Sequence, residues 1–301
     1  MRGIWKWAAI VVFVVCAGSC AAVYKVYSDV KETVEVVYKP FHDELSVKRE
    51  KIIDVAAKDP FSALILGVDE RDGDMGRSDT MIVLTVNPTL NSTKMLSIPR
   101  DTYTELIGLD MKDKLNHAYA YGGLKTTIQS VEELLDIPID YVAKVNMESF
   151  VEIIDIVGGI TVENSFDFTY EGEYFKKGEL QLNGQKALKY VRMRYDDPEG
   201  DFGRQNRQKQ VIQAVLKKSL SLNTVFNYKS IFESLEKNLE MNMVFDDLLT
   251  IQKDYRNSFG EIEQLYLNNG TDSIMNGIYY YMPDENQLKE IHETLKEHLE
   301  L

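Results

Sequence analysis

Residues 61–98, FSALILGVDERDGDMGRSDTMIVLTVNPTLNSTKMLSI, decide the fold. Their first eight residues are a short continuous apolar run, which is typical of a strand buried on both faces. Two further apolar runs, 80–86 and 94–98, flank a turn at Asn87-Pro88 and predict a hairpin. The stretch therefore predicts three neighbouring strands at the centre of a β-sheet.

Outward from these strands, helical and strand patterns alternate along the rest of the chain. The predicted helices cover 126–135, 149–157, 184–190, 203–220, 229–240, 245–256 and 284–299. The further strands cover 141–145, 160–162, 262–267 and 278–281. This alternation predicts an α/β fold, a single α-β-α layered domain with a mixed central β-sheet. We assign the domain to 60–301, with its motifs in 61–220 and a helical and strand part in 221–301.

The N-terminus has a different character. Residues 7–24, WAAIVVFVVCAGSCAAVY, are uncharged and long enough to cross a membrane as a helix. We expect a cytoplasmic tail (1–6), a transmembrane signal-anchor helix (7–24) and a mostly helical stalk (25–59). A cleaved secretory signal, or a lipoprotein site that acylates Cys20, is the alternative. Each interpretation makes the domain extracytoplasmic, and the first anchors it in the cell membrane by one helix.

Composition limits the function. The 34 basic residues against 48 acidic residues give a net charge of −14, which disfavours nucleic acid as a partner. Both cysteines, Cys16 and Cys20, lie in the apolar N-terminal run, so 60–301 has no disulfide, zinc–thiolate site or catalytic thiol. An anionic substrate would require a local basic cluster.

The arginines can form such a cluster, because several of them lie close together in the sequence. Four of the ten fall close together: Arg192, Arg194, Arg204 and Arg207. Two more, Arg77 and Arg100, adjoin predicted core strands. The planar guanidinium group binds phosphate through two hydrogen bonds and stays charged.

The helix predicted from residue 203 brings part of this set together. Its spacing puts Arg204, Arg207 and Gln208 on one face, near a helix N-terminus that suits an anion. The alternative is a surface network in which the arginines pair with nearby carboxylates. Those carboxylates are Asp196, Asp197, Glu199 and Asp201.

Carboxylates at the strand ends indicate a metal. Asp69 follows the first strand, Asp79 begins the second, and Asp101 follows Arg100 after the third. Proteins usually bind Mg²⁺ through one or two carboxylates, and phosphate oxygens of the substrate complete its coordination. We therefore expect Asp69 and Asp79 to bind Mg²⁺, with Mn²⁺ as a substitute. The alternative is that these two carboxylates only cap the neighbouring backbone.

Four segments together resemble the LytR–CpsA–Psr (LCP) family of Gram-positive bacteria. They are GVDERDGDMGRSDTM (67–81), LSIPRDTY (96–103), DKLNHAYAYGG (113–123) and LNGQKALKYVRMRYDDPEGDFGRQNRQKQVI (182–212). The resemblance implies a Mg²⁺-dependent transferase that moves an anionic glycopolymer, above all wall teichoic acid, from undecaprenyl pyrophosphate to peptidoglycan. A phosphodiester forms and undecaprenyl phosphate is released.

The resemblance also implies roles for single residues. Asp69 and Asp79 would bind the metal, and Arg77, Arg100 and Asp101 would be catalytic. The pyrophosphate-binding residues would be Arg77, Arg100, Arg192, Arg194, Arg204, Arg207 and Gln208.

Two other functions compete with the transferase. The first is a non-catalytic module that binds a polyprenyl phosphate or polymer and regulates envelope assembly; it needs the arginines but not the metal pair. The second is a DNA-binding regulator, which the acidic charge and the apolar N-terminal run disfavour.

Overall fold

The computed structural model describes residues 48–69, 76–221 and 239–301, together with a few positions between 28 and 46. The expected tail (1–6) and anchor (7–24) lie outside the described residues. No helix within the described part of the chain has the length and apolar character needed to span a membrane. The predicted helix 229–240 lies largely outside as well, and its last two residues instead begin strand β11 (Leu239–Met241).

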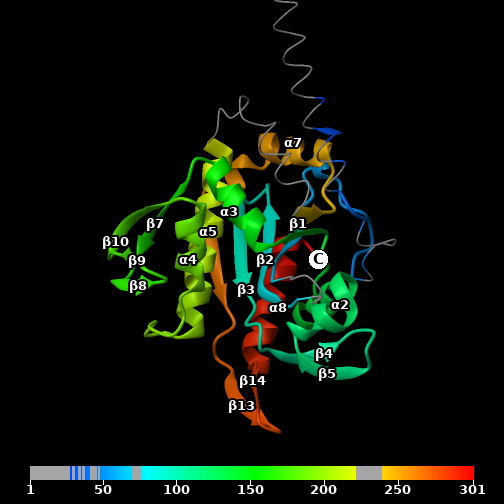
Figure 1. The fold of residues 1–301 in the computed structure, drawn as a ribbon. Coiled ribbons are helices and arrows are strands. Elements are labelled where there is room, and N and C mark those ends of the chain that lie inside the picture. The colour runs from blue at the N-terminus through cyan, green and yellow to red at the C-terminus, as the bar shows by residue number, and fades with distance from the viewer. Residues whose placement is uncertain are drawn as a thin grey trace, which may run out of the picture.

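A six-stranded mixed sheet forms the centre of the domain, in the order β11-β6-β1-β2-β3-β12 (Figure 1). The three strands predicted from residues 61–98 are β1 (Phe61–Val68), β2 (Ser78–Asn87) and β3 (Ser92–Ser97), joined in antiparallel register. β6 (Tyr141–Val145) lies parallel to β1, and β12 (Ile262–Tyr266) lies parallel to β3. The prediction of a mixed central sheet is confirmed.

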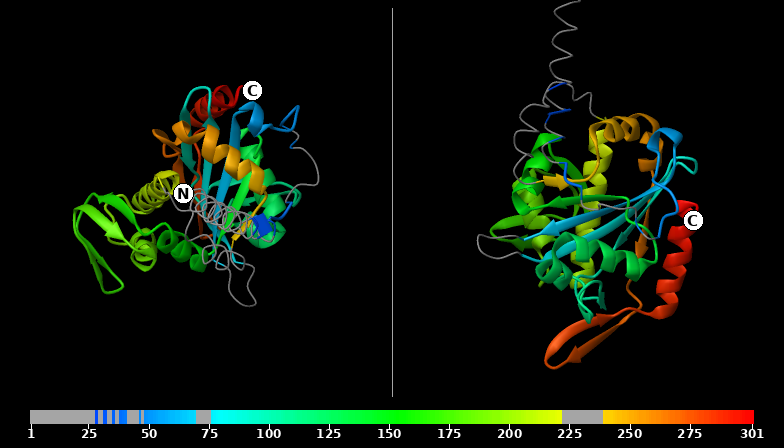
Figure 2. Two further views of the ribbon diagram at one scale, coloured as in Figure 1. Left: turned by 90° about the horizontal axis from the view of Figure 1, so that it is seen from above. Right: turned by 90° about the vertical axis from the view of Figure 1, so that its right-hand side faces the viewer.

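Helices cover both faces of the sheet (Figure 2). On one face, α2 (His117–Leu135) and α8 (Glu285–Leu299) bury Ile128 and Leu295 against Leu64 and Val83. On the other face, α5 (Asp201–Ser221) packs Ile212 and Leu216 against strand residues such as Ile82. Apolar residues alternate between the two faces of β2, so each helix layer has its own core.

A lobe beside α5 forms a further core. It contains α3 (Met147–Ile156), α4 (Gly184–Arg192) and the strands β7 (Ile160–Asn164), β8 (Phe168–Tyr170), β9 (Glu173–Phe175) and β10 (Gly178–Leu182). The remaining elements are β4 (Tyr103–Leu106), β5 (Met111–Lys114), α7 (Phe245–Asp254), β13 (Thr271–Met275), β14 (Ile278–Met282) and the short helices η1 (Val55–Ala57) and η2 (Arg256–Phe259).

Helix α2 begins nine residues before the predicted start at residue 126. The Gly122-Gly123 pair lies at a kink inside the helix, where Gly123 has φ 67° and ψ −158°. Glycine tolerates this conformation, which is strained for a side chain with a Cβ atom. The short strands β4, β5, β8, β9, β10 and β13 were not predicted.

The segment before β1 is tied to the core. Arg49 forms a bidentate ion pair with Asp140, from Nε to Oδ1 at 2.8 Å and from Nη2 to Oδ2 at 2.7 Å. The same carboxylate accepts a hydrogen bond from the Ser62 backbone. Within the predicted helical stalk, residues 48–59 form turns and η1 rather than a continuous helix.

Candidate active site

The ends of the central strands meet at one edge of the sheet. β1 and β3 both run toward this edge, and β2 starts there, because β2 is antiparallel to both neighbours. Asp69 and Asp79 therefore lie at the ends of adjacent strands, and the Asp69 amide donates to the Arg77 carbonyl at 3.2 Å. Open α/β sheets bind ligands at the carboxyl ends of their strands, so the edge is a natural binding position.

Arg100 occupies the centre of this edge. Its Nη1 lies 3.1 Å from Asp79 Oδ2, and its Nε lies 3.5 Å from Asp101 Oδ2. Burial alone would lower the pKa of Arg100, but the charges of Asp79, Asp101 and Asp201 raise it above its ordinary value. The guanidinium group therefore stays cationic although only 21% of the side chain is exposed.

The start of α5 brings two further arginines to Arg100. Arg204 Nη2 lies 2.8 Å from Asp201 Oδ1, and Arg194 Nε lies 3.4 Å from the same oxygen. Burial lowers the pKa of Arg204, and its charge interacts with those of Arg100, Asp79 and Arg194. Three arginines from separate segments thus share one electrostatic cluster, and an anion would relieve their mutual repulsion.

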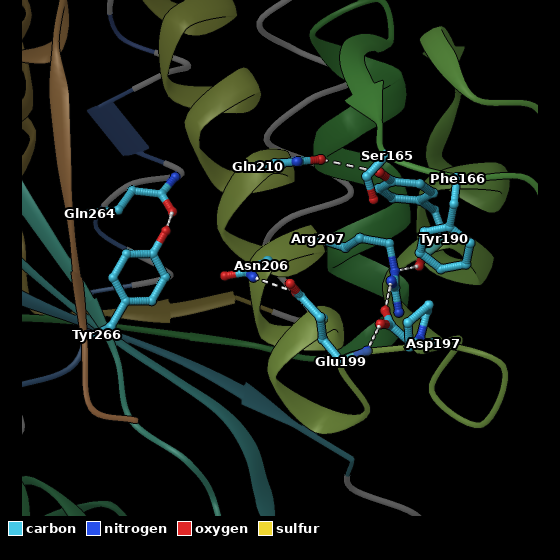
Figure 3. A pocket seen from close by; sticks show the side chains of 12 residues that line it. Ser165, Phe166, Tyr190, Asp197, Glu199, Asn206, Arg207, Gln210, Gln264 and Tyr266 are labelled. Carbon is cyan, nitrogen blue, oxygen red and sulfur yellow. Dashed lines mark hydrogen bonds and ion pairs between the residues drawn. The ribbon is translucent and has the colours of Figure 1, made fainter. Parts of the chain in front are cut away.

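Arg207 has other partners than the three arginines of the cluster (Figure 3). It is 4% exposed and forms a buried ion pair with Asp197. It also donates to the carbonyl groups of Tyr190, at 2.9 Å, and Met193. Its hydrogen-bonding groups therefore hold the loop that carries Arg194. Gly203 permits this arrangement, because a Cβ atom there would overlap the Asp197 carboxylate.

The other predicted phosphate-binding residues lie around the cluster. Arg77 is exposed beside Asp69, and Gln208 is half-buried one turn after Arg204. Arg192 is exposed at the end of α4, where its charge acts on Tyr170 in the lobe. Among the described contacts, none joins these three side chains to Arg100.

Sequence reasoning missed two residues of the site. Lys114 Nζ lies 2.7 Å from Asp101 Oδ1. Asn116 is 4% exposed and donates through Nδ2 to Asp79 Oδ1 at 3.3 Å, while its backbone amide donates to the Arg100 carbonyl at 3.1 Å. Both belong to DKLNHAYAYGG, a segment of the family resemblance in which no single residue was assigned a role. His117 in the same segment forms a hydrogen bond with Asp113.

The oxygen atoms around Asp79 fit a hard divalent cation. Ser78 Oγ and Asn116 Oδ1 are buried beside Asp79 and have no hydrogen-bond partner in the described structure. A buried polar atom without a partner indicates a place that water, an ion or a ligand satisfies. Across the described residues, no group of three or more His, Cys, Asp and Glu side chains could hold a metal alone. Water or substrate oxygens would have to complete the coordination, as Mg²⁺ usually requires.

Comparison with known proteins shows the family of the chain. The sequence model of the LytR_cpsA_psr family matches residues 22–297. A Bacillus subtilis protein, polyisoprenyl-teichoic acid–peptidoglycan teichoic acid transferase TagU, is 48% identical over 283 residues, which cover 94% of this chain and 92% of that protein.

Solved structures are similar over most of the chain. TagT bound to LIIa-WTA superposes with a TM-score of 0.74 at 34% identity, covering 86% of this chain and 98% of that one. A protein from Enterococcus faecalis described as a transcriptional regulator has a TM-score of 0.76 at 39% identity, covering 82% and 90%. The fold is therefore shared over most of the chain.

Proposed function

The chain belongs to the LytR_cpsA_psr family, and we propose that it transfers an anionic glycopolymer, above all wall teichoic acid, from undecaprenyl pyrophosphate to peptidoglycan. The transferase name of a relative with 48% identity supports this function. The observation that carries it is the cluster of Arg100, Arg194 and Arg204 at the carboxyl edge of the sheet. An acidic protein that concentrates guanidinium groups in this way is suited to a diphosphate.

The transfer is a displacement at phosphorus. A hydroxyl oxygen of peptidoglycan forms a bond to the phosphorus nearer the sugar, while the bond from that phosphorus to the bridging oxygen breaks. Undecaprenyl phosphate leaves with the bridging oxygen and, in net terms, takes up the hydroxyl proton. Negative charge grows on the bridging and non-bridging oxygens, where fixed cations stabilise the transition state.

The residues of the site and those around it have different roles in this step. Arg100, Arg194 and Arg204 bind the diphosphate, Arg77, Arg192 and Gln208 extend the binding surface, and Asp101 orients Arg100 and Lys114. Arg207 acts by holding the loop that carries Arg194. Asp69 and Asp79 would hold Mg²⁺, or Mn²⁺ in its place, and the metal would neutralise part of the diphosphate charge.

We further propose that this chemistry takes place outside the cytoplasm, with the chain anchored in the cell membrane through residues 7–24. An enzyme anchored at the outer face of the membrane can bind both a lipid-linked donor and a cell-wall acceptor. The apolar character of 7–24 supports the anchor. Protease accessibility of residues 60–301 in intact protoplasts measures this topology.

The experiment that tests the function is transfer of a lipid-linked precursor to peptidoglycan with added Mg²⁺. The full-length chain should form product, and Asp79→Ala should lose most of it. Equal product from both proteins would remove the metal role. Product from neither, with retained binding of the lipid-linked precursor, would favour the non-catalytic binding module.

A further inference from the structure

A cavity lies between β12 and the lobe of β7–β10 (Figure 3). Its volume is about 490 Å³, and it crosses α5 at Asn206 and Gln210. Gln264 and Tyr266 from β12 line one side, and Phe166 from the lobe lines the other. The mechanism proposed above leaves this cavity without a role.

The charges of the residues that line the cavity disfavour a phosphate group. Arg207 is the one cation among the described residues that line it, and Asp197 neutralises that cation in a buried ion pair. Glu199 adds a carboxylate, which accepts a hydrogen bond from Asn206 Nδ2 at 3.2 Å. A phosphodiester polymer would be repelled there, whereas an uncharged polar ligand would not.

Amide side chains supply matched hydrogen-bond donors. Tyr190 donates its hydroxyl to Gln210 Oε1 at 3.1 Å, and Tyr266 donates its hydroxyl to Gln264 Oε1 at 3.3 Å. These bonds occupy the amide oxygens and leave the NH₂ group of each glutamine as a hydrogen-bond donor. Carbonyl and hydroxyl oxygens of a ligand are such acceptors.

Tyr266 provides a flat apolar surface in a fixed orientation. Lys209 Nζ lies 3.7 Å from the centroid of its ring, and Lys209 itself is only 1% exposed. The tyrosine remains 44% exposed, so part of its ring is open to a ligand. An aromatic face beside amide donors suits a pyranose, whose C–H groups pack on the ring while its polar groups form hydrogen bonds.

The cavity adjoins the site of phosphate chemistry. Tyr266 pairs in register with Ser97, three residues before Arg100. Gly203 lines the cavity, and the next residue is Arg204 of the cluster. A sugar bound in the cavity would therefore lie next to a diphosphate bound at the cluster.

We propose that this cavity binds an N-acetylhexosamine residue of the acceptor glycan strand. The inference rests on the proposed transfer to peptidoglycan and names the part of the protein that receives the acceptor. The acetamido carbonyl accepts hydrogen bonds from the amide NH₂ groups, and the sugar ring packs on Tyr266. The anionic donor polymer is disfavoured by the same charges.

Direct binding of a defined sugar tests the proposal separately from catalysis. The probe is the β-1,4-linked tetramer of N-acetylglucosamine, titrated calorimetrically into the full-length chain, with Tyr266→Ala and Gln210→Leu as variants. Each should weaken binding roughly three- to tenfold, as loss of one aromatic or polar contact does. Tyr174→Ala removes an exposed tyrosine on β9, away from the cavity, and should bind as the unchanged protein does.

Two further measurements separate the possible failures. Undecaprenyl pyrophosphate affinity should be unchanged in Tyr266→Ala and lost in Arg204→Ala, whereas the KM for peptidoglycan should rise in Tyr266→Ala with little change in kcat. Equal tetramer affinity in Tyr266→Ala, Gln210→Leu and the unchanged protein would overturn the acceptor cavity. Full diphosphate binding by Arg204→Ala would instead overturn the proposed function.

Thermal unfolding of each variant identifies any misfolded protein. The variant Tyr266→Phe keeps the aromatic ring and should retain most of the tetramer binding.

Discussion

The Asp79 carboxylate lies 3.1 Å from the Arg100 guanidinium, although one residue lies near the start of β2 and the other follows β3. The contact joins an expected metal ligand to an expected phosphate ligand. Antiparallel pairing of the two strands brings them together, because the start of β2 and the end of β3 share one edge. The cluster therefore depends on the sheet register rather than on a local loop.

Replacing Arg100 with alanine should lower the transfer rate by about 10²–10³-fold, because one fixed donor to a developing oxyanion is lost. The measurement is product formation from a lipid-linked precursor and peptidoglycan. Arg256→Ala, at an exposed position on η2, is the matched control and should leave the rate unchanged. A rate in Arg100→Ala within threefold of the control would exclude a role for Arg100 in the step.

Replacing Asn116 with alanine should weaken divalent-cation binding by roughly 10–100-fold, because its amide supports Asp79. The readout is the electron paramagnetic resonance signal of free Mn²⁺ during titration, which requires no substrate. Asn257→Ala, at an exposed position, is the control. Unchanged Mn²⁺ affinity in Asn116→Ala would show that this amide does not support the metal ligands.

Arg207→Met should destabilise the fold by about 3–5 kcal/mol, because it leaves the Asp197 carboxylate buried without its partner. Adding Asp197→Leu removes that unpaired charge and should restore most of the loss. Denaturant unfolding of the single and double variants measures both effects. If the double variant is no more stable than Arg207→Met, the ion pair does not account for the role of Arg207.

Acid should destabilise the domain through His298. Burial lowers the pKa of His298 to about 4, and its two ring nitrogens lie 2.8 Å from Thr85 and Ser92. The unfolded chain binds this proton near pH 6.5, so the free energy of unfolding should fall by roughly 2–3 kcal/mol between pH 6.5 and 4. His298→Gln should remove this part of the pH dependence, measured by denaturant unfolding. Parallel pH profiles of the two proteins would contradict the assignment.

Lys209→Met should stabilise the fold by roughly 1–3 kcal/mol at pH 7. Burial lowers the pKa of Lys209 to about 8, so the folded state loses this proton at a lower pH than the unfolded chain does. The free energy of unfolding of the unchanged protein should therefore rise between pH 8 and 10.5, and the gain from Lys209→Met should shrink over the same range. A gain that stays constant with pH would argue against a buried ammonium group.

The sequence predicted the central strands because each is a short, mostly apolar run, and β1, β2, β3 and β6 all lie within a few residues of the predicted bounds. The β4–β5 hairpin was missed because its strands are short and mostly polar, including Glu105 and Lys112. Their pairing depends on tertiary contacts, such as the T-shaped contact between Tyr103 and Tyr280. Periodicity alone does not carry that information.

The helix spacing also grouped side chains that the structure separates. Arg204 and Arg207 lie one turn apart on α5, yet Arg204 faces Arg100 while Arg207 turns to Asp197. The expected pairing of arginines with acidic neighbours does occur for Asp197 and Asp201, and it shapes the site. Which carboxylate meets which arginine depends on the path of the loop between α4 and α5, which the sequence pattern does not reveal.

The place of β12 has a consequence for truncated forms of the protein. This strand comes from near the C-terminus and covers the outer side of β3, a strand from the first third of the chain. A fragment ending near residue 220 would contain every recognisable motif but leave the hydrogen-bonding groups of β3 open. Such a bare strand edge recruits other chains, so the fragment should aggregate rather than fold as a smaller enzyme.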